Sequence, residues 1–247
     1  MTNSHRFFRS IIVFGILAFI GAVIVAVAGF NAMQAQRSPV SAPASTETVS
    51  AQPGASDVYA EAEAFLVSLP VTSLAPEQKY EREAQFGRAW LDVDDNGCDT
   101  RNDILQRDFV SFETFRGDCE VQTGILNDPY TGKTIKFVHT NAFGKNTGDS
   151  GAVQIDHIIP LSWAWQNGAD AWDQETRVLF ANDPVNLKAV DGEQNLVKSD
   201  QGPSTWWPTA ESYRCTYALE FTVVLQNYQL TIPAADKQAL VDTLAGC

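Results

Sequence analysis

Positive charge is scarce in this sequence of 247 residues: 17 Lys and Arg stand against 30 Asp and Glu, a formal net charge of −13. Proteins that hold nucleic acid by bulk electrostatics do so through Lys and Arg side chains that neutralise phosphates. The charge balance therefore argues against a strong nonspecific grip on nucleic acid. A bound divalent cation would supply local positive charge that this count omits.

Charge is absent altogether from Ile11–Phe30, a run of twenty residues that is long enough to cross a bilayer as a helix. Two arginines precede the run, so the chain after it is expected on the outer side. Residues 1–30 are read as a cleaved signal peptide or as a retained signal-anchor. Both readings predict a protein that is secreted or anchored to the cell membrane with its folded domain outside. Large apolar side chains are nearly missing from residues 31–56, which predicts a flexible linker before one domain at 57–247.

Cysteine is rare as well, and no Cys-x-x-Cys pair occurs, so the spacing typical of a cysteine-ligated zinc site is missing. All four cysteines follow the apolar run, and an even count in an oxidising compartment favours two disulfides. Three pairings are open. Sequence proximity favours Cys98 with Cys119 and Cys215 with Cys247, and each bond would contribute about 3 kcal/mol by restricting the unfolded chain.

Hydrophobic periodicity predicts an α+β fold with a β-hairpin and added helices. No internal repeat is visible. Helical spacing covers 57–69, 77–91, 161–166, 172–180, 213–228 and 233–244, and a helix is expected to begin at 193–198. Strands are expected at 120–126 and 133–139, joined by a turn at 128–132, and at 153–159 and 186–190.

The run Gln154 to Leu161 carries most of the functional argument. Asp156 and His157 would point to opposite faces of an unbroken strand, so both can serve one site only where the strand ends, and Pro160 ends it. Asp156 and Asn195 offer a carboxylate and an amide oxygen, which suit magnesium, or another divalent cation such as manganese, better than zinc.

The remaining polar residues are of the types that metal-dependent phosphodiester cleavage needs. His157 can accept a proton from water if its other ring nitrogen donates to a backbone carbonyl. Asn186 is expected to fix the connecting loop through bonds to the backbone. Asn195 and Lys198 share one helix face, with Lys198 expected on a phosphate oxygen and with Leu196 and Val197 turned toward the core.

These residues resemble a known family. Asp156-His157-x-x-Pro160, Asn186-Leu187 and Asn195-x-x-Lys198 resemble the HNH endonucleases, and the resemblance implies a ββα-metal core with the Asp and the second Asn on one cation and the His as general base. The segments 95–103, 128–132, 206–208 and 213–215 look like the exported branch of the family related to the C-terminal nuclease domain of GmrSD-type restriction enzymes. The resemblance covers about residues 80 to 247, and it alone favours DNA over RNA as substrate. We expect a monomer.

An acidic segment offers a second metal candidate. Asp92, Asp94 and Asn96 match the first half of a calcium loop, with Asp103 where the loop needs a bidentate Glu. Arg101, nearby, is a candidate for holding a phosphate. The alternative function is therefore a non-catalytic, calcium-stabilised and disulfide-linked module at the envelope surface, which would not need His157.

Overall fold

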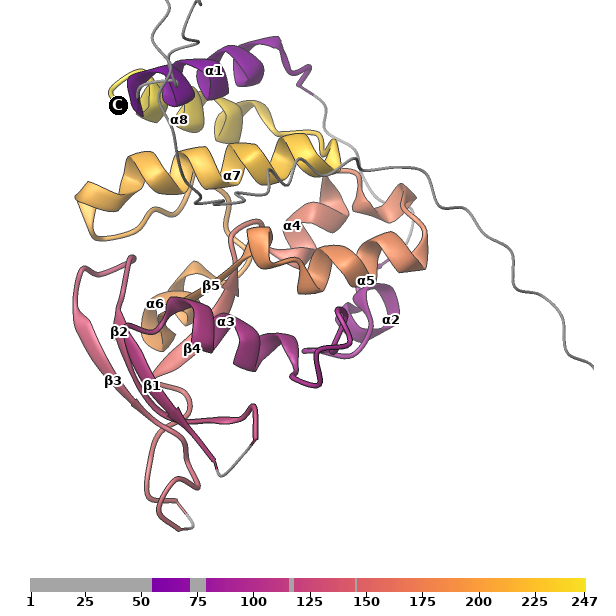
Figure 1. The fold of residues 1–247 in the computed structure, drawn as a ribbon. Coiled ribbons are helices and arrows are strands. Elements are labelled where there is room, and N and C mark those ends of the chain that lie inside the picture. The colour runs from indigo at the N-terminus through magenta and orange to yellow at the C-terminus, as the bar shows by residue number, and fades with distance from the viewer. Residues whose placement is uncertain (1–54, 72–78, 116–117, 145) are drawn as a thin grey trace, which may run out of the picture. The chain divides into compact units, whose positions relative to one another are not determined.

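The computed structural model describes residues 55–71, 79–115, 118–144 and 146–247 (Figure 1). The expected apolar span at 11–30 and nearly all of the expected linker lie outside these residues. Within the described part of the chain, no helix is long and apolar enough to cross a membrane.

Three antiparallel strands form the larger sheet, in the order β1-β2-β3: β1 (Ser111–Thr114), β2 (Val121–Asn127) and β3 (Thr134–Val138). The expected hairpin is confirmed, because β2 pairs with β3 from Thr123 opposite Val138 to Asn127 opposite Thr134. Its turn contains Gly132 at φ 72, a conformation that favours glycine. The carboxylate of Asp128 accepts hydrogen bonds from the backbone N–H groups of Tyr130 and Thr131, which fixes the turn.

The smaller sheet pairs β4 (Val153–His157) with β5 (Leu187–Asp191) in antiparallel register, and α6 (Gly192–Lys198) follows β5 directly. At the start of α6, the N–H of Gly192 donates to Ala152 O at 3.0 Å. A Cβ on Gly192 would overlap the carbonyl oxygen of Gly151, so a glycine is needed there. This close approach places α6 against β4.

Most of the helices lie on one side of the three-stranded sheet (Figure 1). In Figure 1, α1 (Ala55–Ser68), α7 (Arg214–Tyr228) and α8 (Ala234–Leu244) lie together at one end of the domain, and the three-stranded sheet lies at the other. Between these ends lie β4, β5, α6 and four further helices, α2 (Arg82–Phe86), α3 (Thr100–Asp108), α4 (Leu161–Gln166) and α5 (Gln174–Asn182). Single 3₁₀ turns, η1 (Ala169–Ala171), η2 (Pro184–Asn186) and η3 (Glu211–Tyr213), join some of them.

Two apolar clusters hold the domain together. The larger one joins the helices and contains the buried Trp163, Trp165 and Trp206, which are therefore core residues. The smaller one packs α3 against both sheets, mainly through Ile104 and Leu105. Together these clusters place the end of β4 where sheet and helices meet.

Both disulfides pair the cysteines that are nearest in sequence, as expected. Cys98–Cys119 joins the segment before α3 to the segment before β2, with 5.3 Å between the Cα atoms. Cys215–Cys247 ties the C-terminus to α7, with 5.8 Å between the Cα atoms. The described fold is thus a mixed α/β domain closed by two disulfides.

Some expectations differ from the structure. Of the helix expected at 77–91, the described residues 79–91 form only α2, because Gly87 turns to φ 76 and Trp90 to φ 58. Helix α3 was not expected; Asp99 caps it by accepting a hydrogen bond from the N–H of Asn102 at 2.8 Å. The expectation that Leu196 and Val197 face the core is wrong, since their exposed fractions are 71% and 54%.

Candidate active site

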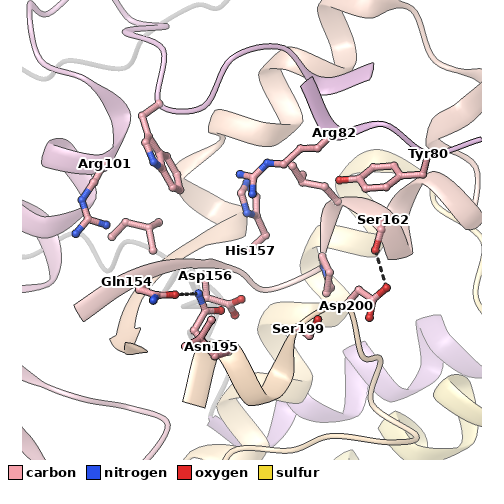
Figure 2. Close-up of a pocket in the computed structure, with 15 residues that line it drawn as sticks. Tyr80, Arg82, Arg101, Gln154, Asp156, His157, Ser162, Asn195, Ser199 and Asp200 are labelled. Carbon is pink, nitrogen blue, oxygen red and sulfur yellow. Dashed lines mark hydrogen bonds between the residues drawn. The ribbon is translucent and has the colours of Figure 1, made fainter. Parts of the chain in front are cut away.

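A cavity of about 580 Å³ opens where β4 and α6 meet the segment that contains α2 (Figure 2). Its wall brings together residues from four parts of the chain. The polar and aromatic ones are Tyr80, Arg82, Trp90, Arg101, Gln154, Asp156, His157, Ser162, Asn195, Ser199 and Asp200. Sequence reasoning named Asp156, His157, Asn195 and Arg101 among these.

Asp156 lies at the base of the cavity with an exposed fraction of 4%. Its Oδ1 accepts from Nζ of Lys198 at 2.9 Å, and its Oδ2 accepts from the hydroxyl of Tyr130 at 2.5 Å. Burial raises the pKa of Asp156, and the lysine and the tyrosine hydroxyl oppose this rise. A carboxylate has about four acceptor sites, and these bonds, together with one from the backbone of His157, leave capacity for a further ligand.

Lys198 is fully buried beneath Asp156 and does not line the cavity. Its Nζ donates to Asp156 and also to His157 O at 2.7 Å, and it lies 5.8 Å from the centre of the Trp206 ring. Burial lowers the pKa of Lys198, and the ion pair with Asp156 opposes this change. The ammonium therefore neutralises Asp156 from behind.

His157 is fixed in orientation by two contacts. Its Nε2 lies 2.8 Å from Ala181 O, and because a carbonyl oxygen only accepts, Nε2 carries the proton and Nδ1 is left as an acceptor. Trp90 stacks on the ring with 6.0 Å between centroids and 14° between planes. Burial lowers the pKa of His157 to about 3; the charges of Arg82 and Lys198 add to this effect, and the bond to Ala181 opposes it.

Asn186 braces the chain that follows β4. It is buried, its Oδ1 accepts from Ile159 N at 2.8 Å, and its Nδ2 donates to Ile159 O at 3.2 Å. Its own carbonyl accepts from Ile158 N at 2.8 Å. These bonds fix the backbone between His157 and Pro160.

Asn195 and Gln154 lie beside Asp156 in Figure 2. Nδ2 of Asn195 donates to Oε1 of Gln154 at 2.8 Å, which leaves the amide oxygen of Asn195 available. The described residues contain no group of three or more His, Cys, Asp and Glu arranged to hold a metal. One carboxylate and one or two amide oxygens fit a hard cation such as Mg²⁺, which keeps several of its waters.

Arg101 occupies the wall next to Gln154 (Figure 2). Its Nη2 donates to Ser150 O at 3.2 Å and to Val153 O at 3.1 Å. Burial lowers the pKa of this guanidinium, and Asp99 opposes the change. The side chain thus ties α3 to the start of β4 and still faces the cavity.

The acidic loop lies apart from the cavity lining. The carboxylate of Asp92 accepts from the N–H groups of Asn96 and Gly97, and the side-chain amide of Asn96 donates to Asp94 and Asp103. Burial raises the pKa of Asp103, and the charges of Asp94 and Asp92 add to it. The four predicted ligands are therefore close together, with oxygens bonded within the loop.

Sequence reasoning did not identify Arg82, Trp90, Gln154 or Tyr130 as site residues. The first two lie in a segment whose pattern predicted a plain helix. Gln154 lies between Val153 and Ile155, and its alternation with Asp156 along β4 is a signal that both share one face. Tyr130 lies in a turn motif, and no local pattern indicates that its hydroxyl reaches β4.

The described residues thus form a disulfide-linked α/β domain with a polar cavity that contains an imidazole, a buried carboxylate and amide oxygens. Residues 99–243 match the family described as GmrSD restriction endonucleases, C-terminal domain, and the chain belongs to that family. A nuclease-type domain of this kind implies a nucleic acid substrate.

The chain is also similar to a protein of Arthroderma benhamiae named "Uncharacterized secreted protein". The two are 35% identical over 188 residues, which cover 75% of this chain and 84% of the relative. No solved structure matches the chain.

Proposed function

We propose that this protein is an exported, metal-dependent endonuclease of the HNH type that hydrolyses phosphodiester bonds, with DNA favoured as substrate. The strand–strand–helix order of β4, β5 and α6 supports assigning them as the ββα-metal unit. The observation that carries the proposal is the orientation of His157. Because Nε2 donates to Ala181 O, the acceptor Nδ1 is available at a cavity wall shared with Asp156 and Asn195.

His157 is assigned as the general base. A pKa of about 3 keeps the ring neutral at physiological pH, which is the form that can accept a proton. A phosphodiester in the cavity brings negative charge, and a nearby negative charge raises the pKa of an imidazole. The phosphodiester charge would therefore favour proton acceptance by His157, against the opposing effect of the cation.

Asp156 and Asn195 are assigned as the protein ligands of a divalent cation, with Gln154 close enough to orient Asn195. A cation held there would stabilise the leaving oxygen and the charge that develops on the phosphate. Lys198 and Tyr130 hold the Asp156 carboxylate in place, one on each oxygen. For Lys198 this geometry supports a positioning role better than the direct phosphate contact suggested by its sequence position.

Export is the second part of the proposal. It rests on the uncharged run at residues 11–30, on the two disulfides, and on the relative that is named a secreted protein. Disulfides persist in oxidising compartments outside the cytosol. Whether residues 1–30 are cleaved or kept as an anchor, the domain lies outside the cell, and we propose that it acts there as a monomer.

A plasmid-nicking assay with and without magnesium tests the function. The parent protein is expected to nick DNA only with the cation, and His157→Ala is expected to lose about two to four orders of magnitude in rate while remaining folded. His139→Ala is a matched control, since His139 pairs with Glu120 at 3.2 Å and does not line the cavity. A folded His157→Ala protein that nicks DNA at the parent rate would refute the mechanism.

Variants of the metal ligands can be distinguished from a variant of the base by how their cleavage rates depend on magnesium concentration. Asp156→Ala is expected to lower both the rate and the affinity for magnesium, with partial recovery at higher magnesium. Asn195→Ala is expected to resemble Asp156→Ala more than His157→Ala. Equal magnesium dependence in all three variants would contradict this assignment.

A further inference from the structure

We propose that Arg82, the first residue of α2, binds a non-bridging phosphate oxygen of the nucleic acid backbone inside the cavity. The inference rests on the proposed function and extends it to a substrate contact. Arg82 precedes the segment 99–243 that matches the nuclease family, so the family match does not assign it a role. It reaches the cavity because the chain from Tyr80 to Trp90 forms one wall.

Arg82 differs from the other cations at the site in its lack of a partner within the described part of the chain. Nη2 of Arg101 is bonded to two backbone carbonyls, and Nζ of Lys198 is bonded to Asp156 and to His157 O. Among the described residues, the guanidinium of Arg82 makes no hydrogen bond and no ion pair. Its side chain is exposed and extends toward His157 in Figure 2. It is therefore available to a ligand that approaches the imidazole.

The local charge also favours an anion. The chain as a whole carries a net charge of −13, but the cavity and the residue beneath it combine Arg82, Arg101 and Lys198 with only Asp156 and Asp200. Asp156 is neutralised by Lys198, and Asp200 accepts a hydrogen bond from the hydroxyl of Ser162 at 3.1 Å. The site is thus a small positive region in an acidic protein, which is the requirement for admitting a phosphodiester.

The chemistry of arginine suits this role. A guanidinium presents a planar fork of donors that matches two oxygens of a phosphate, and it stays charged at any physiological pH. Because Arg82 lies beside the proposed base, a phosphate bound to it would hold the phosphorus close to His157. The same contact would strengthen as negative charge grows on the phosphate oxygens in the transition state.

Arg82→Ala, Arg82→Lys and Arg88→Ala in the full-length protein form a matched set. Arg88 is exposed and belongs to the same segment but does not line this cavity, so it controls for the loss of one positive charge. Melting temperatures establish that each variant is folded. Arg82→Lys keeps the charge without the fork and is expected to recover part of any loss.

Binding of a fluorescein-labelled DNA duplex is measured by anisotropy in EDTA across a salt series, so that no cleavage occurs. Arg82→Ala is expected to reduce the slope of log K against log salt by roughly 0.9, the contribution of one phosphate contact, and Arg88→Ala is expected to leave it unchanged. With magnesium, Arg82→Ala is expected to lower kcat/KM on the order of 10²-fold. If Arg82→Ala reduces the salt slope for an RNA duplex and not for the DNA duplex, the result would support the same phosphate contact with an RNA backbone.

The outcomes separate this inference from the proposed function. If the parent nicks DNA and Arg82→Ala matches Arg88→Ala in both salt slope and rate, the Arg82 contact is refuted and the nuclease assignment stands. If the parent nicks nothing but Arg82→Ala still reduces the salt slope, the phosphate contact stands and the nuclease assignment fails.

Discussion

Replacing His157 by glutamine should change how the stability of the metal-free protein depends on pH. The imidazole is 8% exposed and has a pKa of about 3 in the folded state, against about 6.5 in an unfolded chain. As the pH falls below 6.5, the unfolded state binds this proton first. The stabilisation is therefore complete above the unfolded pKa and is lost as the pH falls through the window from 6.5 to 3.

The two pKa values set the size of the effect. Between about pH 7 and about pH 4.5 the titration of His157 alone should lower the free energy of unfolding by about 2.5 kcal/mol. A glutamine amide can still donate to Ala181 O but does not titrate, so His157→Gln should lack this loss. Carboxyl groups such as Asp156, whose raised pKa acts in the opposite direction, titrate in both proteins and largely cancel in the comparison.

Urea unfolding in EDTA at several pH values, with the disulfides intact, measures both curves. Between about pH 7 and about pH 4.5, the free energy of unfolding should fall by about 2.5 kcal/mol more in the parent than in His157→Gln. Parallel curves, within the error of about 0.5 kcal/mol that is usual for additive comparisons, would refute the conclusion that His157 is held neutral by burial.

Three further predictions concern other parts of the domain. Lys198→Met should lower the free energy of unfolding in urea by about 3–5 kcal/mol, because it leaves Asp156 buried without its cation. Adding Asp156→Asn should recover part of this loss. A loss near zero would show that the ion pair is not sealed from water. Millimolar calcium should raise the melting temperature if the acidic loop binds it, and Asp94→Ala should abolish the rise. If calcium does not raise the melting temperature of the parent, the loop is an ordinary turn. A rise in a protein without nuclease activity would favour the calcium-stabilised module. Non-reducing peptide mapping should recover Cys98 linked to Cys119 and Cys215 linked to Cys247, and any other linkage would contradict the structure.

Local patterns predicted most of the secondary structure. The hairpin of β2 and β3 and the helices α4, α7 and α8 follow from alternation, apolar spacing and turn residues that act over a few positions. Helix α3 escaped prediction because its sequence is mostly polar. The Asp99 cap is a local signal for its start, but the packing of Ile104 and Leu105 against both sheets, on which the helix also depends, cannot be read from a local pattern.

The sequence by itself indicated some of the residues that line the cavity and the end of the strand beside them. Spacing and chemistry were sufficient to select Asp156, His157 and Asn195, which line one cavity. These choices needed only the end of a strand at Pro160 and the start of the helix after β5.

Only the tertiary structure decided how those residues are held. Lys198 turns inward onto Asp156, and Leu196 outward, because α6 packs on β4 with that face of the helix inward. Arg82 and Tyr130 reach the same site from segments tens of residues away. Such contacts depend on how helices and sheets pack, and the periodicity of a single segment carries no information about which distant segment will cover it.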